Sequence, residues 1–196
     1  MRVLIIPEDF TYDQYILKPL IQSMMTHLGK SRAKLLVCRD PMLGGIAQAT
    51  DWDRIAEIIE RYKMIDLFLL CVDRDGQAGR RNKLNEIEAQ AAKILPANHA
   101  FFAENAWQEI EVWVLAGHDL PTDWSWQEIR QEPNPKEKYF FPLAEQKGLP
   151  LTEQELIYKR LSKDAATQYS NRIRRLCQED VAVLESKIKS WITQKA

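Results

Sequence analysis

The sequence is poor in cysteine and has no long hydrophobic run. Its 196 residues include three cysteines at wide separations, an odd number that matches no disulfide framework and no metal-ligand spacing. The longest apolar runs, residues 3–6 and 67–72, are far shorter than the about 20 residues that cross a bilayer. The N-terminus also lacks the apolar stretch and cleavage site of a signal peptide. We therefore expect a cytoplasmic protein with no membrane partner and with buried, reduced cysteines.

Glycine and histidine are scarce as well. None of the seven glycines forms a phosphate-binding loop, because Gly44-Gly45 lacks the dinucleotide spacing and no Gly-x-x-x-x-Gly-Lys follows a predicted strand. The three histidines are isolated from one another, which argues against a histidine metal site or a catalytic triad. The glycine pattern therefore excludes the common nucleotide-binding folds.

Neither sign of charge is in excess. The net charge of −1 excludes the strongly basic body of a nonspecific nucleic-acid coat. The distribution is uneven, with a balance of +1 over residues 1–103, −5 over 104–150 and +3 over 151–196. This pattern fits an acidic metal site flanked by phosphate-binding surface, although solvated helix faces produce it too.

Hydrophobic periodicity predicts alternating strands and helices over the first hundred residues. Strands are expected at 2–6, 33–38, 67–72 and 100–103, with amphipathic helices between them that begin at Thr11, at Thr50 and near residue 84. Because parallel strands need crossovers, the expected fold is α/β, a parallel sheet of about four strands flanked by helices.

Two parts of the chain are expected. Residues 1–118 form the α/β core, which includes a further helix at 107–116. Residues 119–196 form a mainly helical extension packed on that core, with a helix after the Thr152 and Glu155 capping box and a long closing helix from Tyr169 to Ile192.

Acidic residues follow two of the predicted strands. Glu8 comes after the first strand, and Asp73 and Asp75 come after the third. Ligands in open α/β sheets bind beyond the carboxyl ends of strands, so these carboxylates converge if the two strands are neighbours. Converging carboxylates repel one another unless a cation neutralises them, and oxygen ligands select Mg²⁺ or Mn²⁺. The alternative is ordinary turn chemistry, in which Asp and Gly are favoured after a strand.

Another acidic group follows the fourth strand. Glu109 and Glu111 are two residues apart, or about 200° on a helix, so only one of them faces a common site if the segment is helical. Glu111 shares an apolar row with Trp107 and Leu115, so a carboxylate there needs a partner. We expect Glu111 to be the fourth metal ligand, with pairing to a buried arginine as the alternative.

Two basic clusters stand out. The first lies just beyond the acidic pair and is the expected nucleic-acid-binding surface: Arg74, Arg80, Arg81 and Lys83. The second consists of Arg172, Arg174 and Arg175 near the C-terminus, and we expect it to be a solvated helix face.

Glu8 after the first strand and Asp73-x-Asp75 after the third resemble the TOPRIM domain of topoisomerases, primases and OLD-type nucleases. The Glu109-x-Glu111-x-Trp113 segment is similar to small stand-alone TOPRIM-like proteins of the RloB and abortive-infection type. Asn134-Pro-Lys136-Glu resembles an Asp-Pro-Lys stretch in one such family. The chain departs from the pattern at Asp9, where a glycine is usual.

The resemblance implies a Mg²⁺-dependent or Mn²⁺-dependent nuclease of anti-phage defence. Asp73, Asp75 and Glu111 would hold metal, and Glu8 would bind metal or act as general acid/base. Lys136 or Arg80 would stabilise charge in the transition state. The partners expected are DNA or RNA, an ATPase encoded nearby and a second copy of the chain.

Two alternatives remain open. A receiver domain, which accepts a phosphoryl group on an aspartate such as Asp73, shares the acidic layout. A receiver also needs Ser or Thr after the fourth strand, where this chain has Ala103-Glu104-Asn105. The other alternative is a non-catalytic interaction subunit with the same fold.

Overall fold

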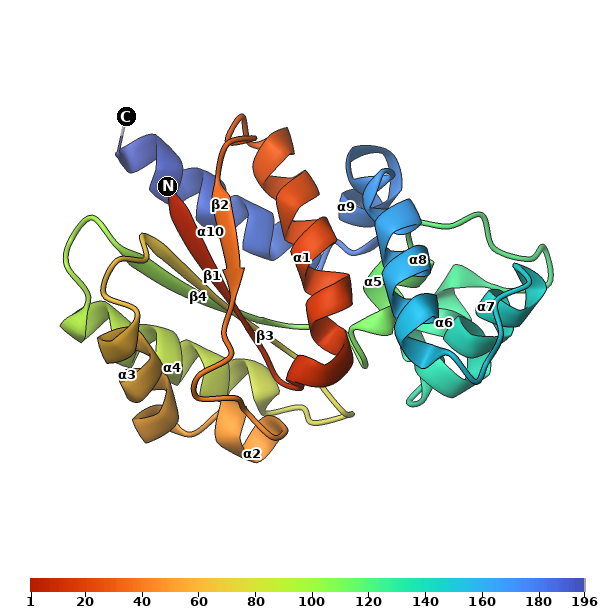
Figure 1. The fold of residues 1–196 in the computed structure, drawn as a ribbon, viewed down its shortest axis with the longest axis horizontal. Coiled ribbons are helices and arrows are strands. Elements are labelled where there is room, and N and C mark those ends of the chain that lie inside the picture. The colour runs from red at the N-terminus through yellow and green to blue at the C-terminus, as the bar shows by residue number, and fades with distance from the viewer. Residues whose placement is uncertain (196) are drawn as a thin grey trace.

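The sheet is four-stranded and entirely parallel (Figure 1). The computed structural model describes residues 1–195. The strands are β1 (Arg2–Pro7), β2 (Lys34–Val37), β3 (Leu67–Val72) and β4 (Ala100–Asn105), in the order β2-β1-β3-β4. The α/β prediction is confirmed, and so is the condition on which the acidic site depends, because β1 and β3 are neighbours.

Helices cover both faces of the sheet. Alternate residues of β1 point to opposite sides, so Val3 and Ile5 join one hydrophobic cluster and Leu4 and Ile6 another. The first face packs against α1 (Phe10–His27) and α10 (Val181–Gln194). The second packs against α3 (Trp52–Arg61) and α4 (Arg80–Ile94), with the short α2 (Ile46–Ala49) nearby.

The remaining helices lie beside the sheet, next to α1 (Figure 1). They are α5 (Glu111–Leu115), α6 (Trp126–Gln131), α7 (Phe141–Gln146), α8 (Gln154–Ala166) and α9 (Arg174–Leu176), with π-helical turns η1 (Lys136–Phe140) and η2 (Tyr169–Ile173). Their apolar side chains belong to the same cluster that covers the first face of the sheet. Residues 119–195 are thus mainly helical and share a core with the α/β part.

Helix boundaries differ from the prediction where aspartates compete with threonines. Asp9, not Thr11, caps α1, because its side chain accepts the Thr11 N–H at 2.7 Å. Asp51 in turn caps α3 in place of Thr50. Such short side chains satisfy the free N–H groups of a first helical turn. Pro19 lies inside α1, which continues past it to His27.

Two predicted helices are shorter than expected. The helix expected at 107–116 begins only at Glu111. The closing helix is divided into η2, α9 and α10. Asp180 separates the last two, because its carboxylate accepts hydrogen bonds from the Val181 N–H and from three other donors.

The outer edge of β4 is covered by charged side chains at Ala103. The Ala103 N–H donates to Glu88 at 2.6 Å, and its carbonyl accepts from Arg81 at 2.8 Å and from Lys187 at 3.2 Å. Arg81 also donates to the buried Glu104 at 2.6 Å. This stretch of the edge strand therefore offers no free backbone group to a further strand.

The three cysteines are unpaired and buried. None of the helices in residues 1–195 combines the length and the apolar character that a bilayer span requires.

Candidate functional site

The pairing of β1 with β3 brings Glu8 and Asp73 together. Pro7 of β1 lies opposite Cys71 of β3, so both strands end at the same edge of the sheet. The Asp73 N–H donates to Glu8 Oε2 at 3.0 Å, and the Ile110 N–H donates to Asp73 Oδ1 at 2.8 Å. Glu8 and Asp73 therefore lie together at this edge, whereas Asp75, the third carboxylate expected to converge with them, is exposed.

The two residues line an open cavity of about 450 Å³ at the carboxyl edge of the sheet. Its other carboxylates come from the start of α1, from the segment that precedes α5 and from the first residue of α5, and a single lysine accompanies them. We call this the acidic cavity, and its lining comprises Glu8, Asp9, Asp13, Gly44, Gly45, Asp73, Glu109, Glu111 and Lys136.

Several of these carboxylates are held through one oxygen. Asp13 accepts the N–H of Asp9, its neighbour across the first turn of α1, at 3.0 Å. Glu109 accepts the backbone N–H of Lys136 at 3.0 Å, and Glu111 accepts the hydroxyl of the buried Tyr158. The backbone and the core therefore fix where each group points.

The second oxygen remains open in four of the groups: Asp13, Asp73, Glu109 and Glu111. In each of them it accepts no hydrogen bond from residues 1–195, and it is not sealed away from the cavity. Four fixed carboxylates, each with one oxygen that accepts no hydrogen bond from residues 1–195, make a set of hard donors. Such a set fits Mg²⁺ or Mn²⁺ and no soft metal. Within the described residues, no three of these groups are arranged closely enough to coordinate one metal ion together.

Burial makes the negative charges of the cavity unfavourable. It raises the pKa of Glu8, and it raises the pKa values of Asp13 and Asp73 well above their ordinary range, with repulsion from Glu111 adding to both aspartates. It also raises the pKa of Glu109 to about 7. Perturbed carboxylates gathered in one cavity are typical of a functional site.

Lys136 is the cation of the acidic cavity. Its Nζ lies 3.7 Å from Glu111 Oε1 and 5.8 Å from the centre of the Tyr158 ring. Desolvation lowers the pKa of Lys136, but the attraction of Glu111 and Glu109 outweighs it and leaves the pKa raised. The ammonium is therefore charged at neutral pH and balances only part of the negative charge.

Asp75 and Arg80 lie outside the cavity lining. Asp75 occupies a left-handed turn with φ of 51°, is exposed, and pairs with Arg80 at 3.4 Å. It is close enough to raise the pKa of Glu8, after the larger effect of burial. Arg80 is mostly buried, and its Nε has no partner in the described residues. Both residues therefore stand at the rim of the site.

The structure divides the predicted nucleic-acid-binding cluster. Arg81 is engaged by Glu104 and Ala103, so it serves the β4 edge. Lys83 is exposed and lies 3.9 Å from Glu86. Arg74 stacks on the Trp107 ring, 4.3 Å from its centre. Of these three, only Arg74 adjoins a residue of the acidic cavity.

The second basic cluster is not a simple solvated face. Arg172 donates to the carbonyl of Ala116, and Arg174 pairs with Glu185 at 2.8 Å. These two side chains tie elements together, while the side chain of Arg175 makes no hydrogen bond or ion pair with residues 1–195.

Sequence reasoning missed Asp13 and rejected Glu109. The rejection was wrong because the segment is not helical at Glu109, and both Glu109 and Glu111 reach the cavity. The spacing of Asp9 and Asp13 could have indicated Asp13, because residues four apart lie on the same side of a helix.

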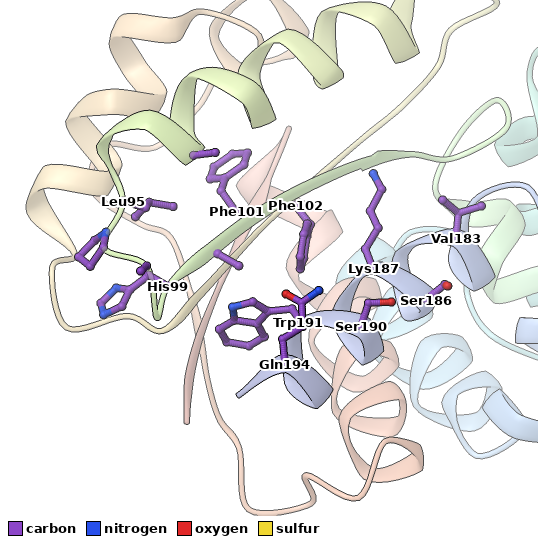
Figure 2. Close-up of a pocket in the computed structure, with 14 residues that line it drawn as sticks. Leu95, His99, Phe101, Phe102, Val183, Ser186, Lys187, Ser190, Trp191 and Gln194 are labelled. Carbon is purple, nitrogen blue, oxygen red and sulfur yellow. The ribbon is translucent and has the colours of Figure 1, made fainter. Parts of the chain in front are cut away.

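A larger hollow of about 700 Å³ lies elsewhere, between α4, β4 and α10 (Figure 2). Its walls include Leu95, Phe101, Phe102 and Trp191, and no carboxylate lines it. Its lining includes His99 and Lys187, but it lacks the hard oxygen donors that the acidic cavity provides.

Comparisons with protein-family models, curated proteins and solved structures find no match to this chain. The function of the site is therefore inferred from its own residues.

Proposed function

We propose that this protein hydrolyses phosphodiester bonds in nucleic acid with Mg²⁺ or Mn²⁺ held in the acidic cavity, as a TOPRIM-like nuclease. The observation that carries the proposal is the set of fixed carboxylates that share one cavity and leave an oxygen open to it. Such a set is costly to a fold unless a cation occupies it.

The ligands would be Asp73 and Glu111, joined by Asp13 and Glu109, with Glu8 beside them. A bound divalent cation would polarise the scissile phosphate and stabilise the leaving oxygen. Asp75 stands at the rim, where a ligand role requires its turn to move inward. Asp13 and Glu109 supply donors that the sequence pattern alone does not assign.

Two residues have roles besides metal binding. Glu8, whose pKa is raised by burial, is suited to act as a general acid or base beside the metal. The charged ammonium of Lys136 faces the same cavity and would stabilise the extra negative charge of the transition state. Arg80 can assist from the rim once its pairing with Asp75 is broken.

The test is a cleavage assay with labelled single-stranded and duplex DNA and RNA in Mg²⁺, in Mn²⁺ and in EDTA. The parent protein should cut at least one substrate with a metal and none in EDTA. Asp73→Asn should lower the rate at least about 100-fold, because it removes a ligand charge. Asp123→Asn, an exposed aspartate outside the cavity, is the matched control and should cut normally.

Three results would contradict the proposal. Two of them are cleavage that survives EDTA and cleavage at equal rates by Asp73→Asn and Asp123→Asn. The other is a mass gain of one phosphoryl group at Asp73 after incubation with acetyl phosphate, which would indicate a receiver. A role in phage defence and an ATPase partner remain predictions from the resemblance.

A further inference from the structure

Two arginines that lie against aromatic rings flank the acidic cavity. Arg39 follows β2, and its guanidinium lies 5.1 Å from the centre of the Phe10 ring. Arg74 follows β3, and its guanidinium lies 4.3 Å from the centre of the Trp107 ring. Because the strand order is β2-β1-β3, these arginines leave the sheet on either side of Glu8, which follows β1.

Both guanidinium groups keep their donors free. Within residues 1–195, neither side chain makes a hydrogen bond or an ion pair, although Arg39 is exposed and Arg74 is half-buried. Arg80 and Arg81, by contrast, are paired with carboxylates. Stacking on a ring orients the planar fork of an arginine without using its N–H groups.

The supporting rings come from anchored positions of the backbone. Phe10 is the first residue of α1, next to the capping Asp9. The Trp107 N–H donates to the buried Asp180 at 3.1 Å, and Arg130 approaches the Trp107 ring at 5.4 Å. Each arginine therefore rests on a ring whose backbone is anchored, at the start of α1 or at Asp180.

We infer that Arg39 and Arg74 bind backbone phosphates of a nucleic-acid strand on the two sides of the phosphate to be cut. The strand would cross the carboxyl ends of β2, β1 and β3, with its scissile phosphate over the acidic cavity. This inference rests on the proposed function, and it gives the path of the substrate. Contacts of this kind carry no base information, so binding should not depend on sequence.

The inference is tested with a binding assay that does not depend on cleavage. Anisotropy of a labelled DNA single strand is measured over a salt series in Ca²⁺, with the parent and with the double variant Arg39→Gln, Arg74→Gln. The slope of log K against log salt is negative, and its magnitude should be smaller in the double variant by about 1.4, which is about 0.7 for each lost phosphate contact.

Two further variants act as controls. Arg32→Gln, Lys34→Gln removes the same charge at the amino edge of the sheet, where Lys34 begins β2, and should leave the slope unchanged. Arg39→Lys, Arg74→Lys keeps the charge and should restore most of the slope while binding more weakly than the parent, because lysine lacks the planar fork.

The inference is overturned if the parent shows no salt-dependent binding, if the double glutamine variant keeps its slope, or if the amino-edge control loses as much. The proposed function is judged separately, by the cleavage assay on Asp73→Asn. Cleavage that persists in the double glutamine variant with unchanged binding would reject the strand path and leave the nuclease proposal standing.

Discussion

Glu109 shows how one residue of the acidic cavity opposes folding. Its pKa of about 7 lies above the ordinary value of 4.5, so between these pH values the folded protein binds more protons than the unfolded chain. The free energy of unfolding therefore falls as pH rises from about 4.5 to about 7, as long as no cation is bound.

Glu109→Gln should remove part of this fall. In EDTA at pH 8, thermal unfolding of the variant should occur roughly 2–4 °C above the parent, equivalent to about 1 kcal/mol for this partly exposed group. At pH 4.5 the two should melt together. Glu145→Gln, at an exposed position, serves as the control. If the Tm of the parent and of Glu109→Gln depends on pH in the same way, the charge of Glu109 does not affect stability.

Metal binding can be followed through stability without any substrate. Millimolar Mg²⁺ or Mn²⁺ should raise the Tm of the parent, because a ligand that binds only the folded state stabilises it. Asp73→Asn should lose most of this response, whereas Asp75→Asn should keep most of it, since Asp75 lies outside the cavity lining. Equal losses in the two variants would place Asp75 among the ligands.

At the scale of elements, one glycine sets how closely two helices approach. A Cβ on Gly117, just after α5, would lie 2.6 Å from both Cα and Cβ of Ala165 in α8. Such a contact needs a shift of the backbone, not of a flexible side chain. The same two helices carry Glu111 and the Tyr158 hydroxyl that holds it.

Gly117→Ala should therefore destabilise the protein by about 1–3 kcal/mol, as overpacking does in a dense core. Gly79→Ala is the matched control, because a Cβ there meets nothing within 4 Å and φ is −81°. Urea unfolding of both variants measures the difference, and a Gly117→Ala protein as stable as the control would mean that α8 moves freely.

Strands were easier to predict than helix ends. Leu67–Val72 was predicted to the residue, because its apolar run is bounded by Asp66 and Asp73. β4 was predicted to end at Ala103 but continues through Glu104 and Asn105, since buried polar residues look like the end of a strand. Arg81, which neutralises Glu104, lies far away in sequence.

The site was predictable where it depends on strands and not where it depends on loops. Glu8 and Asp73 follow from the alternation of strands and helices together with the β1–β3 pairing. Glu109 depends on α5 beginning at Glu111, and hydrophobic periodicity does not reveal that start. The place of Lys136 in the cavity came from the resemblance and from no pattern in the chain.

At the scale of the whole molecule, the sheet and the helices of residues 119–195 share one core. A single hydrophobic cluster includes Leu69 of β3, Ile21 of α1, Leu161 of α8 and Ile188 of α10. The buried Asp180 adds polar links, accepting from the Trp113 indole at 2.9 Å and from Arg130 at 2.8 Å.

Unfolding should therefore be a single transition. Tryptophan fluorescence reports mainly on residues 107–191, and far-UV circular dichroism reports on all the helices and strands, yet the two urea curves should coincide. Separate midpoints would show that the helical part is a domain of its own.

The charged cover on Ala103 has a consequence for how the protein behaves at high concentration. A bare edge strand can recruit a strand from another molecule and begin aggregation. Here Glu88 occupies the amide and Lys187 the carbonyl of Ala103, so an approaching chain meets side-chain charges in place of backbone groups. Glu88→Ala would expose the amide and leave Lys187 without its nearest carboxylate, so we expect the variant to be less soluble than the parent at high concentration.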